Sequence, residues 1–240
     1  MKPVEEILWA NHTRGEFLEW AKRGTVVIVP IASTEQHGLH LPEDTDQRTV
    51  EYVSREAARR LDVPVLVTPT IPFGVSPHHM VHPGTITLSV ETTVRVLKEV
   101  CRSIAAHGFE RILILSGHGG NGNTVGAAAL ELKHELNQQV AAFNWFDPVQ
   151  TKIDAITEGP CHTIGHAGEA ETSAILFTAP HLVRRERYAL VADISDDPSI
   201  GTAEKGQRIL EAGVEALMAT LERMAAQPGR RVVGIERAEA

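Results

Sequence analysis

The sequence predicts an α/β fold in which helices cover both faces of a mostly parallel central sheet. Three apolar, β-branched runs, at residues 25–31, 63–67 and 111–115, lack the alternation of a strand with one solvated face. Such runs are typical of strands that are buried on both sides. Stretches with a helical pattern separate them, and strands that alternate with helices favour a parallel sheet.

The first elements follow from local pattern. Residues 14–22 mix aromatic and charged side chains, which predicts a short amphipathic helix that ends at Gly24. The strand at 25–31 comes next. A helical stretch over 46–60 then leads to the strand at 63–67.

A loop is predicted over residues 69–85, because prolines and glycines interrupt this stretch repeatedly. The loop carries three histidines. Ser89 then has the residue type of a helix N-cap, and Gly108 that of a helix end. We therefore predict a helix over 89–106.

The strand at 111–115 leads directly into the segment S-G-H-G-G-N at 116–121. We predict that a helix over 123–136 and a strand over 140–145 follow. Residues 147–165 have a mixed pattern and are predicted to be rich in loops.

An apolar segment predicts a helix over 166–177, and Thr202 is predicted to cap a last helix that runs to residue 226. The sequence contains no internal repeat and no stretch with the composition of a linker. We therefore expect a single domain over residues 1–240.

The charge of the chain argues against nucleic acid as a partner. Its formal net charge is −8, and its basic residues are scattered, whereas a phosphate-binding surface needs clustered lysine and arginine. Arg184, Arg185 and Arg187 form the densest basic group, and we interpret them as a solvated face.

The cysteine content and the N-terminal sequence predict a cytoplasmic protein. Cys101 and Cys161 are far apart and outside any C-x-x-C, so we expect neither a disulfide framework nor a thiolate zinc site. Acidic and basic residues break the stretch Met1–Trp20, which excludes an apolar signal region, and no apolar run reaches the length of a membrane span.

Groups able to bind a metal ion follow two of the predicted strands. Glu35 and His37 come after the strand at 25–31, and two side chains that are two residues apart point the same way in extended chain. Asp46 follows, and His118 comes after the strand at 111–115. Loops at the carboxyl ends of parallel strands converge, so these nitrogen and oxygen ligands predict a site for zinc, manganese or iron(II).

His166 and Glu169 add an imidazole and a carboxylate at i and i+3, which lie on one side of a helix. A single histidine or glutamate is far more often a surface or hydrogen-bonded residue than a ligand, and Gly119-Gly120 could merely form a tight turn. The chain has no G-x-S-x-G elbow of a serine esterase, and no Lys-Ser or Lys-Thr follows the glycines as in a phosphate-binding loop.

Four segments together resemble the creatininase, or creatinine amidohydrolase, family. The resemblance covers nearly the whole chain, and A-E-K-G at 203–206 is a weaker fifth match. It implies a three-layer α/β/α sandwich, a homohexamer, and two divalent metal ions bridged by an aspartate. The four segments are S-T-E-Q-H-G-x-H-L-P-x-x-T-D at 33–46, H-P-G-T at 82–85, S-G-H-G-G-N at 116–121 and H-A-G-E-x-E-T-S at 166–173.

Carried over residue by residue, the resemblance implies that Asp46 bridges the two metal ions. Glu35 and His118 would bind one ion and His37 the other. In creatininase the remaining carboxylate lies where this chain has Gly120. We therefore expect Glu169 to be the substitute ligand.

The resemblance also implies the chemistry. Two metal ions on a shared carboxylate lower the pKa of a bridging water or hydroxide and polarise a carbonyl, as attack on an amide requires. His166 would deliver a proton to the leaving nitrogen. Creatininase has a glutamate before this histidine where this chain has Gly165, so we expect another acid, Glu171, to orient His166.

The resulting hypothesis is a metal-dependent amidohydrolase that cleaves a non-peptide carbon–nitrogen bond in a small cyclic amide or formamide. The alternatives are a hydrolase of a cyclic polyol-derived diketone, a peptidase of a redox-cofactor precursor, and a metal-containing binding protein without turnover. Candidates for substrate contacts are His78, His79, Arg48 and the loop over 147–165.

Overall fold

The computed structural model describes residues 6–189, 191 and 193–230. Among them lies one sheet of four parallel strands in the order β2-β1-β3-β4, which confirms the predicted fold class. Two predictions extend beyond the described residues. The stretch Met1–Trp20 includes residues 1–5, and the predicted domain includes residues 231–240, which lie outside the description. The strands are β1 (Val26–Ile31), β2 (Val65–Val67), β3 (Arg111–Ser116) and β4 (Gln139–Asn144).

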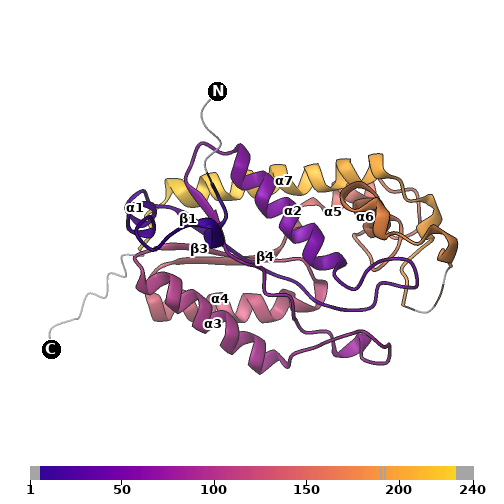
Figure 1. Ribbon diagram of the computed structural model, residues 1–240, viewed down its shortest axis with the longest axis horizontal. Helices are drawn as coiled ribbons and strands as arrows, with labels where there is room; N and C mark the ends of the chain where they lie inside the picture. Colours follow the sequence, from indigo (N-terminus) through magenta and orange to yellow (C-terminus); the bar gives the residue numbers. More distant parts are fainter. Residues whose placement is uncertain (1–5, 190, 192, 231–240) are drawn as a thin grey trace, which may run out of the picture.

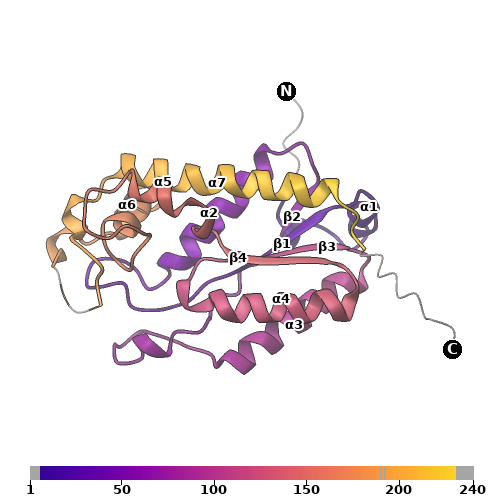
Figure 2. The same ribbon diagram turned by 180° about the vertical axis from the view of Figure 1, so that it is seen from behind.

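Helices cover both faces of this sheet (Figures 1 and 2). Successive side chains of β1 point to opposite faces: Val26 and Ile28 pack with α2 and α7, and Val27 and Val29 pack with α3 and α4. The continuous apolar run was therefore a correct sign of burial on both sides. The helices are α1 (Phe17–Lys22), α2 (Thr45–Arg60), α3 (Val90–Ala106), α4 (Gly122–Leu136), α5 (Gln150–Asp154), α6 (Glu169–Thr178) and α7 (Ala203–Ala226).

Two predicted helix caps are confirmed by their hydrogen bonds. The Ser89 hydroxyl accepts from the backbone N–H of Thr92 at 3.1 Å, at the start of α3. The Thr202 hydroxyl accepts from the backbone N–H of Lys205 at 3.2 Å, at the start of α7. Gly108 follows α3 with a φ of 91°, a backbone conformation that favours glycine.

The start of α6 differs from the prediction. The helix begins at Glu169 rather than at residue 166, because Ala167 has a φ of 50° and cannot continue a right-handed helix. His166 therefore lies in the preceding loop, and the expectation that His166 and Glu169 share one side of a helix is wrong. The loop-rich stretch 147–165 begins with a 3-10 helix (Asp147–Val149) that leads into one short α-helix, α5.

The register of the sheet brings two distant segments together. Ile31 at the end of β1 is the partner of Ser116 at the end of β3. The segment that carries Glu35 and His37 and the segment that carries His118 thus leave the same edge of the sheet side by side. Within the described part of the chain, no helix combines the length and the apolar character that crossing a bilayer would need.

Candidate metal centre

His37 is held with one ring nitrogen free. Its Nδ1 atom lies 3.0 Å from the backbone carbonyl oxygen of Glu35. A carbonyl can only accept, so Nδ1 carries a proton and Nε2 is the nitrogen that can bind a cation. Nε2 lies 3.3 Å from Oδ1 of Asp46 and 3.5 Å from Oε2 of Glu171.

His118 has the same arrangement with its two nitrogens exchanged. Its Nε2 atom lies 3.1 Å from the carbonyl oxygen of Val75 and 3.0 Å from the Ser76 hydroxyl. Its Nδ1 atom faces inward, 3.1 Å from Oε1 of Glu35 and 3.2 Å from Oδ2 of Asp46. Backbone carbonyls thus fix the tautomers of both histidines, as is usual for histidines that ligate metals.

Asp46 lies between the two histidines. It is in the first turn of α2, and its Oδ1 faces His37 while its Oδ2 faces His118. Each carboxylate oxygen therefore points to a different half of the cluster. A carboxylate that bridges two cations needs this geometry.

The donor set fits one or more divalent cations. Glu35, His37, Asp46 and His118 are buried, with at most 5% of any residue exposed. Glu35 Oε1, His37 Nε2 and Asp46 Oδ2 have no hydrogen-bond partner among the described residues, although a buried polar atom without a partner is costly. Nitrogen and oxygen donors in such proximity suit zinc, manganese or iron(II).

Electrostatics also favours a cation at this place. Burial lowers the pKa of His118, but the carboxylates of Asp46 and Glu35 outweigh burial and raise it to about 10. Burial likewise opposes the charge of His37, and Glu171 and Asp46 raise its pKa well above the usual value. The carboxylates thus hold protons on both imidazoles, and a bound divalent ion would replace those protons.

The structure does not bring Glu169 into this cluster, which corrects its assignment as the fifth ligand. Its Oε2 accepts from the backbone N–H groups of Glu158 at 2.8 Å and Gly159 at 2.7 Å. Its Oε1 lies 2.6 Å from Nζ of Lys205. The Glu169 carboxylate is therefore neutralised by a lysine and has no free oxygen for a metal ion.

Glu171 lies where Glu169 was expected. Its Oε2 atom is near Nε2 of His37 and accepts from the backbone N–H of Ala167 at 2.5 Å. One ligand atom each from His37, His166 and Glu171 lies within 4.8 Å of the others. The sequence alone does not decide which of the two glutamates faces the cluster, because that depends on where α6 begins.

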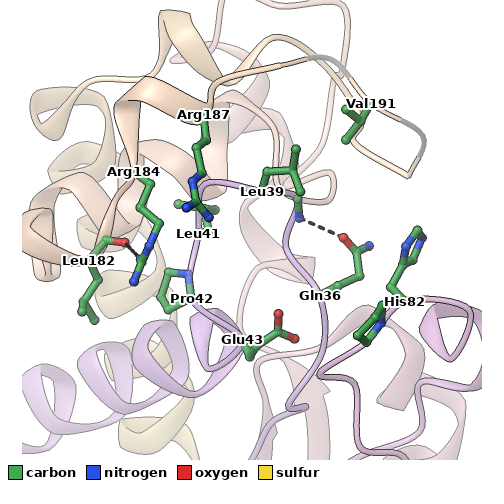
Figure 3. Close-up of a pocket in the computed structure, with 12 residues that line it drawn as sticks. Gln36, Leu39, Leu41, Pro42, Glu43, His82, Leu182, Arg184, Arg187 and Val191 are labelled. Carbon is green, nitrogen blue, oxygen red and sulfur yellow. Dashed lines mark hydrogen bonds between the residues drawn. The ribbon is translucent and has the colours of Figure 1, made fainter.

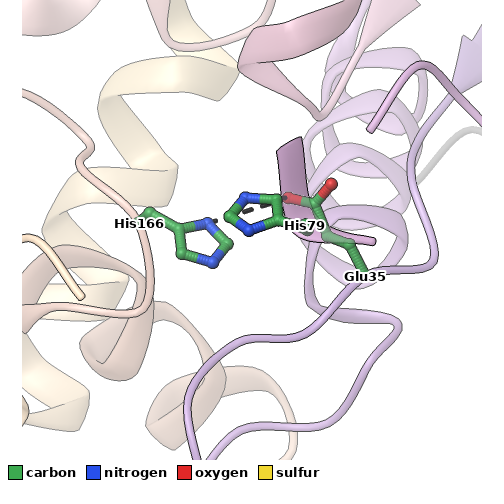
Figure 4. A group of neighbouring side chains, drawn as sticks. All are labelled: Glu35, His79 and His166. Carbon is green, nitrogen blue, oxygen red and sulfur yellow. Dashed lines mark ion pairs between the residues drawn. The ribbon is translucent and has the colours of Figure 1, made fainter. Parts of the chain in front are cut away.

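His166 is oriented by Gln36 rather than by an acid. Its Nε2 atom lies 2.8 Å from the backbone carbonyl oxygen of Gln36, and its Nδ1 atom lies 3.7 Å from Oε1 of Glu35. The Gln36 amide nitrogen lies 3.0 Å from Nδ1 of His79, whose ring stacks on that of His166 at 4.2 Å. Figure 4 shows both imidazoles beside the Glu35 carboxylate. Glu171, expected to orient His166, makes no hydrogen bond to it among the described residues.

A cavity of about 330 Å³, called here the metal cavity, opens onto this cluster. His78 and Phe146 form part of its wall, as do Ile164 and Gly165 from the stretch 147–165. Arg48 does not line it, and its guanidinium pairs instead with Asp44, the residue directly before α2. Of the proposed substrate contacts, the two histidines and the end of the loop therefore reach the site, and Arg48 does not.

The backbone leaves no space for a side chain at Gly120. A Cβ atom there would lie 2.6 Å from the carbonyl oxygen of Val75 and closer still to Nε2 of His118. At Gly119 a Cβ atom would meet no other atom within 4 Å. An acid at position 120, as in creatininase, is therefore incompatible with this backbone.

Two site residues escaped the sequence analysis. Ser76 donates from its hydroxyl to Oε2 of Glu35 and contacts His118, so it links two ligands. Gln36 acts partly through its backbone carbonyl, which every residue has. The only feature of the sequence that could have indicated these residues is their place in it. Gln36 lies between the proposed ligands Glu35 and His37, and Ser76 precedes the pair His78-His79.

Comparison with known proteins identifies the family. The family model of creatininase, described as creatinine amidohydrolase, matches residues 10–221. The mycofactocin precursor peptide peptidase of Mycobacterium tuberculosis is 32% identical over 235 residues, which cover 84% of this chain and 86% of that protein. The 3-dehydro-scyllo-inosose hydrolase of Thermotoga maritima is 30% identical over 186 residues, which cover 75% of this chain and 58% of that protein.

Solved structures agree on the fold. A crystal structure of creatinine amidohydrolase superposes with a TM-score of 0.83 at 21% identity, over 93% of this chain and 100% of that chain. Further structures of that enzyme are described as a manganese form and as a zinc–zinc type. The sheet, the family match and the identities to named hydrolases lead to one conclusion: this chain is a hydrolase of the creatininase family.

Proposed function

We propose that this chain is a metal-dependent amidohydrolase that cleaves a non-peptide carbon–nitrogen bond in a small cyclic amide or formamide. The observation that carries the proposal is the division of the Asp46 carboxylate between His37 and His118. It supports two divalent ions, zinc, manganese or iron(II), on one bridging carboxylate. The proposed ligands are Glu35, His37, Asp46, His118 and, in place of Glu169, Glu171.

Bound at these ligands, the ions would polarise a carbonyl oxygen and lower the pKa of a water molecule to near neutrality. The protein supplies the rest. The buried ligands and the small cavity limit bulk water around the reacting group, which strengthens every electrostatic interaction there.

His166 is the group we assign to proton transfer. Its Nε2–H donates to the Gln36 carbonyl, which leaves Nδ1 unprotonated and facing the cluster. Nδ1 can accept a proton as the carbonyl is attacked and return it to the leaving nitrogen. Burial and the neighbouring charge of His37 lower the pKa of His166, which favours the neutral form that such a base needs.

The similarity to a peptidase supports a second candidate, cleavage of a peptide bond. The same ligands and the same histidine would serve both reactions, since each breaks a carbon–nitrogen bond next to a carbonyl. The metal cavity volume, near the lower end of ligand pockets, favours the small-molecule reaction. Parallel assays with small amides, formamides, lactams and short peptides separate the two.

Metal content tests the proposal directly. We would measure it by elemental analysis in the parent protein, in Asp46→Ala and in Asp44→Ala, a half-exposed control two residues away. Two ions per chain in the parent and the control, both lost from Asp46→Ala together with amide hydrolysis, would support the bridged centre. A parent that binds neither zinc, manganese nor iron when these are supplied would refute it.

We also propose that residues 1–240 form one domain, that the protein is cytoplasmic, and that it assembles as a homo-oligomer, a hexamer by resemblance to its family. The family match over 10–221 supports the first point, and the free thiols of Cys101 and Cys161 support a reducing compartment. Light scattering of the purified protein tests the assembly.

A further inference from the structure

A second cavity, of about 710 Å³, lies beside the metal cavity. Arg184 and Arg187 line it on one side, and Gln36 and His82 line it on the other (Figure 3). Leu39, Leu41 and Leu182 add apolar walls. We call this space the arginine cavity. It combines two guanidinium groups with an apolar lining.

Neither arginine has an acidic partner among the described residues. Arg184 donates to the backbone carbonyl of Leu182 at 2.6 Å, and neither guanidinium forms an ion pair within this part of the chain. Many other arginines of this acidic chain are paired, as Arg48 is with Asp44. Two like charges at one cavity repel each other, and an anion between them would relieve that repulsion.

The arginine segment is tied to the metal-binding segment. The backbone N–H of Arg184 donates to the carbonyl oxygen of His40 at 2.9 Å. The His40 ring in turn lies 2.9 Å from the Thr172 hydroxyl on α6. The stretch that supplies His37 to the metal cluster thus also fixes one wall of the arginine cavity.

Side chains in the walls of the two cavities contact one another. The Gln36 amide lines the arginine cavity and contacts His79 and His166 of the metal cavity. Nε2 of His82 lies 2.6 Å from Oδ2 of Asp193, and these two residues line the arginine cavity and the metal cavity respectively. The two cavities are therefore neighbours, and a ligand that displaces the Gln36 amide or the His82–Asp193 pair could reach both.

We propose that the arginine cavity binds an anionic group, a carboxylate or a phosphate monoester, at one end of a substrate whose scissile amide lies at the metal centre. This inference rests on the proposed function and names the class of its substrate. The anion lies at Arg184 and Arg187, and the apolar part of the molecule packs on the leucines. Glu43, which lines the floor of the same cavity, would repel an anion placed at the opposite end.

Direct binding tests this inference without any turnover. Calorimetric titrations of the metal-loaded protein would use phenylbutyrate, its neutral amide and phenyl phosphate. At least one anion should bind on the order of tenfold more tightly than the amide, since hydrogen bonds to charged groups are the strong ones. The preference should vanish in the double variant Arg184→Gln/Arg187→Gln and persist in Arg185→Gln, an adjacent exposed arginine that does not line the cavity. The tighter of the two anions identifies the natural group.

Two further measurements distinguish anion binding at the arginines from binding at the metal ions and from subunit contact. If the preference survives in the double variant but disappears in Asp46→Ala, the anion binds the metal ions and the inference is overturned. A change in assembly mass by light scattering with an unchanged preference would likewise overturn it, because the arginines would then serve subunit contact. Equal binding of the anions and the amide to the parent protein would also overturn it.

Hydrolysis links the two cavities. N-formyl ω-amino acids of increasing chain length would be compared with their neutral amides. The acids should have the lower KM at one favoured length, and the double variant should remove that advantage, whereas Arg185→Gln should keep it. Hydrolysis without any acid preference would defeat this inference and leave the amidohydrolase proposal standing. If anions bind at the arginines but the protein neither binds metal nor hydrolyses amides, the amidohydrolase proposal fails and the anion site stands.

Discussion

The Nζ atom of Lys205 lies 2.6 Å from Oε1 of Glu169, and this ion pair is almost entirely buried between α6 and α7. It connects the start of α6 to the first turn of α7. The other oxygen of Glu169 accepts two backbone N–H groups from the loop beside the metal cavity. Glu169 therefore holds structure together, while Glu171, two residues on, faces the metal cluster.

The two glutamates should respond differently to the same substitution. Glu171→Gln should lower metal affinity at least on the order of tenfold, the usual cost of losing even an outer partner of a ligand. Glu169→Gln should keep its metal and lose about 3 kcal/mol of unfolding free energy, because Lys205 is left without its buried partner. Elemental analysis and urea unfolding measure the two effects.

Glu158→Gln is the matched control for this pair. Glu158 also contacts Lys205, at 3.1 Å, but its side chain is 72% exposed. Its replacement should change neither metal content nor stability appreciably. A Glu169→Gln protein that loses metal at normal stability would restore Glu169 as the ligand.

Adjacent glycines offer a second matched pair. Gly120→Ala should destabilise the protein by about 1–3 kcal/mol and weaken metal binding, because the new methyl group would press on Val75 and on the ring of His118. Gly119→Ala should be nearly neutral, since its methyl group enters open space. Thermal unfolding and metal titration would compare them. Equal effects at both positions would mean that the loop adjusts freely.

His166→Asn should reduce kcat by about two to four powers of ten, the range for loss of a general acid or base. Metal content should stay at the parent level, since His166 is assigned to proton transfer and not to the ligand set. His107→Asn, at an exposed position after α3, is the control. Unchanged kcat in His166→Asn would reassign proton transfer to another group, and His79 would be examined next.

His40 should make stability depend on pH. Burial and the charge of His37 lower the pKa of His40 to about 4 from its ordinary value of 6.5. The unfolded chain therefore takes up this proton at a higher pH than the folded chain. Stability should fall as pH drops from 6.5 to about 4, by roughly 3 kcal/mol, and the loss from this group should level off below.

His40→Gln isolates that contribution. Urea unfolding of both proteins at the same metal loading should give curves that diverge across this pH range, with the variant less sensitive to acid. Contributions from the metal site are common to both proteins and cancel in the difference. Parallel curves would show that folding does not shift the pKa of His40.

Much of the fold could be predicted because its signals are local. The β1 run, the Ser89 and Thr202 caps and Gly108 each act through neighbouring residues, and the structure has all of them. Glu35 and His118 could be placed together because parallel strands end at one edge. The two side chains come together because β1 and β3 are parallel, and the alternation of strands and helices in the sequence already predicted parallel strands.

The start of α6 could not be predicted in the same way. The choice between Glu169 and Glu171 depends on the positive φ of Ala167 and on a lysine in a distant helix. Neither leaves a periodic signal in the sequence. Arg184, Arg185 and Arg187, interpreted as a solvated face, are exposed as predicted. Only the folded chain shows that the backbone N–H of Arg184 is bonded to the carbonyl of His40 and that two of these arginines line a cavity.

The proposed metal ligands come from three separate parts of the chain: the segment from β1 to the first turn of α2, the segment after β3 and the first turn of α6. Cys101 and Cys161 are both free, so the protein has no covalent cross-link among its described residues. Ions bound at this centre would cross-link the three parts reversibly, and only the folded chain brings the ligands together to bind them. Resistance to unfolding would then rise with the free metal concentration in the cell, by mass action.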